Sequence, residues 1–138
     1  MKTQKINHLA VWLLVVMYQV IGAGWYGTFA QQWMALTGLK ESDFADPDPT
    51  PYIIAIVTAI IVNYGLAVLF IKLQVQLLVQ GLKTAAFIWF AFQFADVATT
   101  NAFSLKSFEL TLVDTGKTFV CFVVSGALLG AWIKFKKA

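Results

Sequence analysis

Four long runs of apolar residues dominate the hydrophobic pattern of the chain. They cover about residues 6–25, 52–71, 82–103 and 108–133. About 20 apolar residues in an α-helix cross a bilayer core about 30 Å thick, so each run is long enough to span a membrane. The second run lacks the polar stripe that every helix of a soluble four-helix bundle needs. The pattern predicts an all-α, four-transmembrane-helix bundle that forms one integral membrane domain over residues 1–138.

A shorter pattern lies between the first two runs. Phe29, Trp33 and Leu36 recur at helical spacing, with Gln31 and Gln32 on the opposite face. This spacing predicts a short amphipathic helix at about residues 28–37, lying at the outer membrane interface. Aromatic side chains are enriched at such interfaces, and the segment offers four interfacial residues: Trp25, Tyr26, Phe29 and Trp33.

Composition narrows the function classes. The chain is 59% hydrophobic and 12% charged, against about 25% charged in soluble domains, which excludes disorder and an ordinary soluble globule. Its lysines flank the apolar runs and form no basic patch, so no nucleic-acid partner is expected. The single Cys121 excludes an internal disulfide, and the single His8 disfavours a metal or haem site. No catalytic motif is present, so we expect a non-enzymatic protein without a cofactor.

The distribution of lysines sets the expected orientation. One side of the predicted helices carries seven lysines, whereas the other carries two lysines and five acidic residues. Lysine-rich loops stay in the cytoplasm, which predicts a multi-pass protein of the inner (plasma) membrane with both termini cytoplasmic. One alternative stays open: residues 2–24 also fit a signal peptide, and its cleavage would leave three spans with their ends on opposite sides.

Glycines suggest where helices meet. The spacing of Gly22, Gly24 and Gly27 matches a dinucleotide-binding fingerprint, but it lacks the strand and βαβ context that the fingerprint requires. We therefore interpret these glycines as sites of close helix approach. Gly126 and Gly130 form a small-xxx-small pair. That pair favours packing within the bundle, and homodimerisation stays open as the alternative.

Ionisable residues inside the apolar runs are costly and therefore informative. Asp96, Asp114 and Lys117 fall at similar depth in the predicted outer half of the membrane. Further polar positions on the other helices face the same interior, giving a predicted intramembrane polar cluster of Asp96, Asp114, Lys117, Gln93, Gln19 and Asn63. Three hypotheses fit the cluster. The favoured one is an internal ion pair that joins the third and fourth helices. The others are a polar pocket or pathway for an ion, proton or small solute, and an interface with another membrane subunit.

Two stretches carry a family resemblance. The first is GWYGTF at residues 24–29 with QWMALTG at 32–38, and the second is GLKT at 81–84 with GALLGAW at 126–132. Their order and spacing resemble the bacterial membrane family called domain of unknown function 1761. The resemblance implies a four-span inner-membrane protein and no catalytic residues. The family's usual residues at positions 96 and 117 are uncharged, which favours a compensating pair between Asp96 and Lys117 in this member.

These observations favour one function and leave a second open. The first is a non-enzymatic membrane protein that acts through helix-mediated association, as a homo-oligomer or as an accessory subunit of another membrane complex. The alternative is a small permease or ion/proton-conducting unit that uses Asp96, Asp114 and Lys117. The lipid bilayer is the expected environment in both cases.

Overall fold

The computed structural model describes residues 2–137, and nearly all of its regular structure is helical. The helical elements are α1 (His8–Thr28), α2 (Ala30–Thr37), the 3₁₀ turn η1 (Glu41–Phe44), α3 (Thr50–Lys72), α4 (Leu78–Ile88), the π-helical η2 (Trp89–Phe94), α5 (Ala95–Phe103) and α6 (Phe108–Ala131). Because α4, η2 and α5 follow one another without a break, they form one long helix, Leu78–Phe103. The four long helices are each apolar enough to cross a membrane, as the sequence predicted, and they indicate a multi-pass membrane protein.

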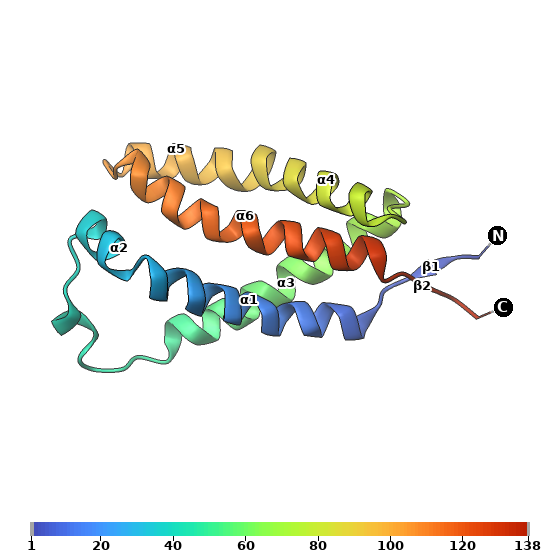
Figure 1. Ribbon diagram of the computed structural model, residues 1–138, viewed down its shortest axis with the longest axis horizontal. Coiled ribbons are helices and arrows are strands. Elements are labelled where there is room, and N and C mark those ends of the chain that lie inside the picture. Colours follow the sequence, from blue (N-terminus) through green and yellow to red (C-terminus); the bar gives the residue numbers. More distant parts are fainter. Residues whose placement is uncertain (1, 138) are drawn as a thin grey trace.

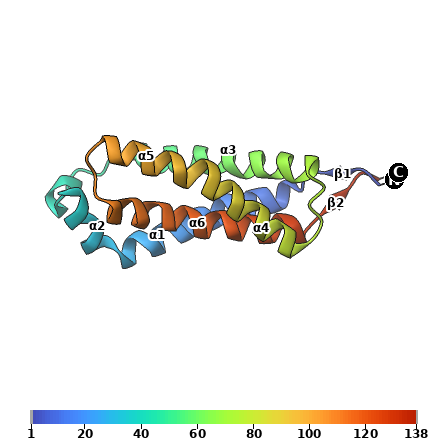
Figure 2. The ribbon, with the colours of Figure 1, turned by 90° about the horizontal axis from the view of Figure 1, so that it is seen from above.

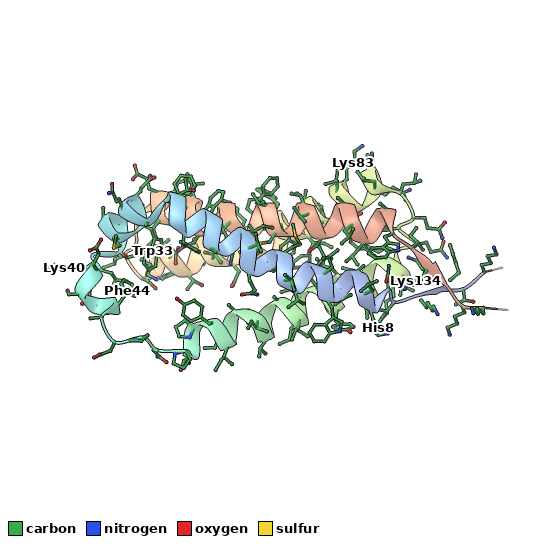
Figure 3. The ribbon with its side chains drawn as sticks, turned by 60° about the horizontal axis from the view of Figure 1, so that its bottom comes forward. His8, Trp33, Lys40, Phe44, Lys83 and Lys134 are labelled. Carbon is green, nitrogen blue, oxygen red and sulfur yellow. The ribbon has the colours of Figure 1, made fainter. Side chains whose placement is uncertain are left out.

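The long helices lie side by side along the longest axis of the molecule (Figure 1). α6 packs against α1, α3 and α4, whereas the third long helix has its main contact with α6 alone. Both termini emerge at one end, and α2 lies at the opposite end (Figures 1 and 2). His8, Lys83 and Lys134 mark the terminus-bearing end, and Trp33 and Lys40 mark the other (Figure 3).

A short clasp that the sequence did not predict ties the two termini together. β1 (Gln4–Lys5) pairs antiparallel with β2 (Lys134–Phe135). The side chain of Asn7 caps α1 by accepting from Ala10 N–H, and its amide donates to the Trp132 carbonyl at 3.1 Å. α6 therefore ends at Ala131, two residues before the predicted limit, because the chain extends to enter the clasp.

The apolar core lies toward the terminus-bearing end. There α1 buries Val11 and Leu14 against Leu66 and Phe70 of α3, with Leu129 of α6 completing the cluster. The other half of α3 is different, since residues 50–58 are all exposed. α3 diverges from α1 toward the end that carries α2 (Figure 3), so the helices separate where no large apolar side chains hold them together.

Glycines set the distance between α4 and α6. A Cβ atom added at Gly126 would lie 2.6 Å from the Ala85 Cβ, and one at Gly130 would lie 2.6 Å from the Leu77 carbonyl oxygen. Gly81 of α4 lies directly opposite Gly126. Gly126 and Gly130 are therefore confirmed as positions of close helix approach. The two helices that approach each other there belong to the same chain.

The prediction of close approach at Gly22, Gly24 and Gly27 is wrong. A Cβ atom at any of the three would meet no atom within 4 Å. α1 continues through all three glycines to Thr28, and the chain turns only at Phe29 before α2. Glycine spacing alone does not say which way each position faces, and Gly22, Gly24 and Gly27 border open space on different sides of α1.

Candidate functional site

A cavity of about 960 Å³ opens between α1, α3 and α6 in the half of the molecule that carries α2. The cavity exists because α3 diverges from α1 in this half of the molecule, which leaves a space between the helices. Its walls are mostly apolar and aromatic. Its lining comprises Tyr18, Gln19, Gly22, Ala23, Tyr26, Ala30, Trp33, Met34, Phe44, Pro51, Tyr52, Ala55, Thr58, Ala59, Val62, Gln93, Lys117, Thr118, Cys121 and Phe122.

A buried polar network closes the deep end of the cavity. The Ser125 hydroxyl donates to Asn63 Oδ1 at 2.7 Å and lies 3.0 Å from the Tyr18 hydroxyl. Because a hydroxyl carries one proton, Ser125 donates to Asn63 and accepts from Tyr18. Asn63 also donates to the Ala59 carbonyl at 2.9 Å. Each of these polar groups is satisfied, so the network holds α1, α3 and α6 together and positions Tyr18 at the cavity wall.

Gln19 joins the two helices that diverge. Its amide donates to the Val15 carbonyl of its own helix at 3.3 Å and to the Ala55 carbonyl of α3 at 3.5 Å. Gln19 and Ala55 both line the large cavity, so this contact bridges α1 and α3 within its wall.

Asp114 is held by aromatic donors. Tyr26 O–H donates to Asp114 Oδ1 at 2.8 Å, and Trp33 Nε1–H donates to the same oxygen at 3.2 Å. The two rings are nearly perpendicular, with centroids 5.8 Å apart. An anionic acceptor strengthens both hydrogen bonds, so Asp114 fixes Tyr26 and Trp33 in place as one wall of the cavity.

The expected ion pairs are absent from residues 2–137. No acidic side chain in this range lies within ion-pairing distance of Lys117, although Asp114 is three residues away on the same helix. Asp114 instead accepts from two neutral donors of α1 and α2, both at Oδ1. Asp96 does not approach Lys117 either, because it lies exposed on α5.

A second, smaller cavity lies on the other side of the aromatic wall. It has a volume of about 670 Å³ and is bordered by α2, the 105–107 turn and the first turns of α6. Trp33 lines both cavities, Asp114 lines only the smaller one, and Lys117 lines only the larger one. The two charges on one face of α6 are thus divided between two cavities.

The structure brings together part of the predicted polar cluster. Gln19, Gln93 and Lys117 line the large cavity, and Asn63 lies directly behind it. Asp114 is behind the aromatic wall, and Asp96 is outside the site. Sequence reasoning missed Tyr18 as a member of the site, although it directly precedes Gln19.

Most of the predicted interfacial aromatics face α6. Trp25 Nε1–H donates to the Val113 carbonyl at 2.9 Å, and its ring lies over Gly116, where an added Cβ would be 2.8 Å from a ring carbon. Tyr26 and Trp33 contact Asp114, while Phe29 packs on Trp25 with ring centroids 4.8 Å apart. The missed residue here is Gly116, whose role depends on a ring 91 positions earlier in the chain.

Comparison with known proteins gives one match. The family model described as "Protein of unknown function (DUF1761)" matches residues 9–130, which contain all four long helices except their outermost residues. No curated protein and no solved structure matches the chain.

Proposed function

The chain belongs to the DUF1761 family, and from that premise we propose that it is a non-enzymatic multi-pass membrane protein that binds a small amphiphilic molecule between α1, α3 and α6. The observation that carries the proposal is the cavity of about 960 Å³. Ligand sites typically measure about 300–1,000 Å³ and combine apolar walls with a few polar groups. This cavity has that composition, with Lys117, Gln93 and Gln19 among apolar and aromatic neighbours.

We place the cavity in the outer leaflet. Tyr26, Asp96 and Asp114 each lie 18 positions from the residue that begins or caps their long helix at the terminus-bearing end. At the helical rise this is about 27 Å, close to the full thickness of a bilayer core of about 30 Å. The exposed Asp96 then lies at the headgroups, where its charge is solvated, and α2 lies along the same surface.

The distribution of lysines supports an orientation in the inner membrane with both termini in the cytoplasm. Of the ten lysines, those at the terminus-bearing end are Lys2, Lys5, Lys72, Lys83, Lys134, Lys136 and Lys137. Lysine-rich ends face the cytoplasm. Cysteines introduced at Lys2 and Ser42, in a Cys121→Ala background, test this. An impermeant maleimide on intact cells should label position 42 only, and labelling of position 2 would reverse the orientation.

The cavity opens toward the acyl chains of lipid. Along the cavity, α3 exposes residues 50–58 and α1 presents Gly22 and Ala23, which have little or no side chain. A molecule dissolved in the outer leaflet can therefore enter sideways between the two helices. This route favours an amphiphile over a fully hydrated solute.

Two matched glycine variants test the proposal. Gly22 lines the cavity, whereas Gly24, on the same helix, does not. Both have no neighbour within 4 Å of an added Cβ, so a side chain can begin at either position without a clash at Cβ. We expect native mass spectrometry in a mild detergent to find a bound amphiphile on the wild type and on Gly24→Phe, and none on Gly22→Phe. Equal occupancy of the two variants would contradict the proposal.

A second candidate function is association through the third long helix, as a homo-oligomer or with another membrane subunit. The observation that favours it is burial. Only 11% of the Leu78–Phe103 window is buried, against 39% for α6. If this face binds a partner, Phe87→Ala and Phe92→Ala should shift the mass of the detergent-extracted assembly to that of a single chain. An unchanged mass would exclude the interface.

A further inference from the structure

The large cavity contains one positive charge without a matching negative charge. Lys117 lines it, and the nearest acid along α6, Asp114, faces the smaller cavity and accepts from Tyr26 and Trp33. No acidic side chain is among the residues that line the large cavity. A half-buried ammonium in apolar surroundings favours an anionic partner, because its desolvation is otherwise not compensated.

A second polar group lies at the same level as Lys117. Gln93 and Lys117 are each 15 positions from the terminus-bearing ends of their helices, or about 22 Å at the helical rise. Both line the cavity. An ammonium and an amide at one level provide N–H donors for a head group of one negative charge.

We propose that the ligand is a carboxylate attached to an apolar body, with its carboxylate at Lys117 and Gln93. This inference rests on the proposed function and specifies the ligand of the same cavity. The apolar body lies against Ala59, Val62 and Phe122 and leaves through the gap between α1 and α3 toward the lipid. The occupant is thus an acid of the fatty-acid type that reaches the cavity from the outer leaflet.

The number of charges favours a carboxylate over a phosphate monoester. A phosphate monoester carries about −1.5 to −2 at neutral pH, and the cavity lining has one cation, Lys117. The extra negative charge would remain unpaired in apolar surroundings, which is costly. A carboxylate carries one charge and offers two oxygens, one for the ammonium and one for the amide.

The test uses three probes with the same twelve-carbon chain: dodecanoate, 1-dodecanol and dodecyl phosphate. The full-length protein is placed in phosphatidylcholine nanodiscs, and binding is measured by native mass spectrometry with empty nanodiscs as the blank. We expect the wild type to bind dodecanoate at least about tenfold more tightly than 1-dodecanol, the size of one charge-assisted hydrogen bond. Dodecyl phosphate should bind less tightly than dodecanoate.

Three lysine variants assign the preference to one side chain. Lys117→Gln should bind dodecanoate and 1-dodecanol about equally, and Lys117→Arg should keep the preference because it keeps the charge. Lys40→Gln, which changes an exposed lysine outside the cavity, should behave as the wild type. Circular dichroism shows whether each variant folds, and if Lys117→Gln does not fold, Lys117→Met, which also removes the charge, takes its place with the same expected loss of preference.

The outcomes separate this inference from the proposed function. If the wild type binds no probe, the proposed function itself fails. If it binds dodecanoate and 1-dodecanol equally, the cavity binds amphiphiles but the carboxylate inference is overturned. Tighter binding of dodecyl phosphate, or a preference that survives in Lys117→Gln, also overturns it.

Discussion

The contact between α4 and α6 makes the sharpest stability prediction, because it depends on glycines that face backbone atoms. At Gly126 an added methyl group would lie 2.6 Å from the Ala85 Cβ and closer still to the Gly81 carbonyl oxygen. Ordinary carbon contacts lie at about 3.5–4.0 Å. The two helices must therefore move apart by about 1 Å to admit it, since a backbone carbonyl cannot rotate away as a side chain can.

The magnitude follows from two opposed effects. Alanine favours a helix over glycine by about 0.5–1 kcal/mol. Overpacking at a tight contact costs about 1–3 kcal/mol, and the rigid backbone partners at Gly126 place it at the upper end of that range. We therefore expect Gly126→Ala to lower the free energy of unfolding by about 1–2 kcal/mol. Gly81→Ala should act in the same direction, because its added Cβ would meet the Gly126 carbonyl.

Gly65 provides the matched control. It lies within α3, and no atom would lie within 4 Å of an added Cβ. Gly65→Ala should keep only the gain in helix propensity and raise the free energy of unfolding by about 0.5–1 kcal/mol. Both variants are measured by unfolding in mixed micelles of mild detergent and dodecyl sulfate, followed by circular dichroism. The reasoning is refuted if Gly126→Ala is as stable as Gly65→Ala.

Two further predictions concern carboxylates outside that contact. Asp114→Asn keeps an acceptor oxygen for Tyr26 and Trp33 and should cost about 1 kcal/mol, whereas Asp114→Leu leaves both donors unpaired and should cost at least about 2 kcal/mol in the same assay. Equal losses would show that the hydrogen bonds do not hold the aromatic wall. Hydrogen bonds from Thr50 lower the pKa of Asp48 from 3.8, so its stabilising contribution is present above that value and is lost as pH falls through the lower, folded-state pKa. Acid unfolding of Asp48→Ala should therefore lack this component as the pH falls below about 4, and an unchanged acid profile would contradict the assignment.

The sequence predicts the four long helices because lipid imposes a length and a composition on each of them independently. Thr50–Lys72 and Leu78–Phe103 need no knowledge of any partner to be recognised. The termini clasp could not be predicted in this way, since β1 and β2 are two residues each and pair only because α1 and α6 bring them together.

The partners of the charged residues depend on contacts between distant parts of the chain. Local spacing places Lys117 three residues from Asp114 on one helix face, whereas the predicted ion pair joined the third and fourth helices through Asp96 and Lys117. Tyr26 and Trp33 are 88 and 81 residues away. Tyr26 reaches Asp114 from α1, and Trp33 reaches it from α2, which follows the turn at Phe29. The same holds for the glycines. Gly126 and Gly22 look alike in sequence, but only the first faces another helix.

The division of Asp114 and Lys117 bears directly on what the cavity does. Had the two side chains paired, the pair would have been neutral, and the cavity would have discriminated ligands by shape alone. Tyr26 and Trp33 stabilise the Asp114 carboxylate without neutralising it, so no charge on α6 is cancelled within the helix. The Lys117 ammonium is only partly desolvated, because the residue is half-buried and its long side chain can extend toward the membrane surface. An anion that entered between α1 and α3 would compensate the remaining desolvation of Lys117, and under the proposed function this would let the cavity prefer a ligand with a negatively charged head group.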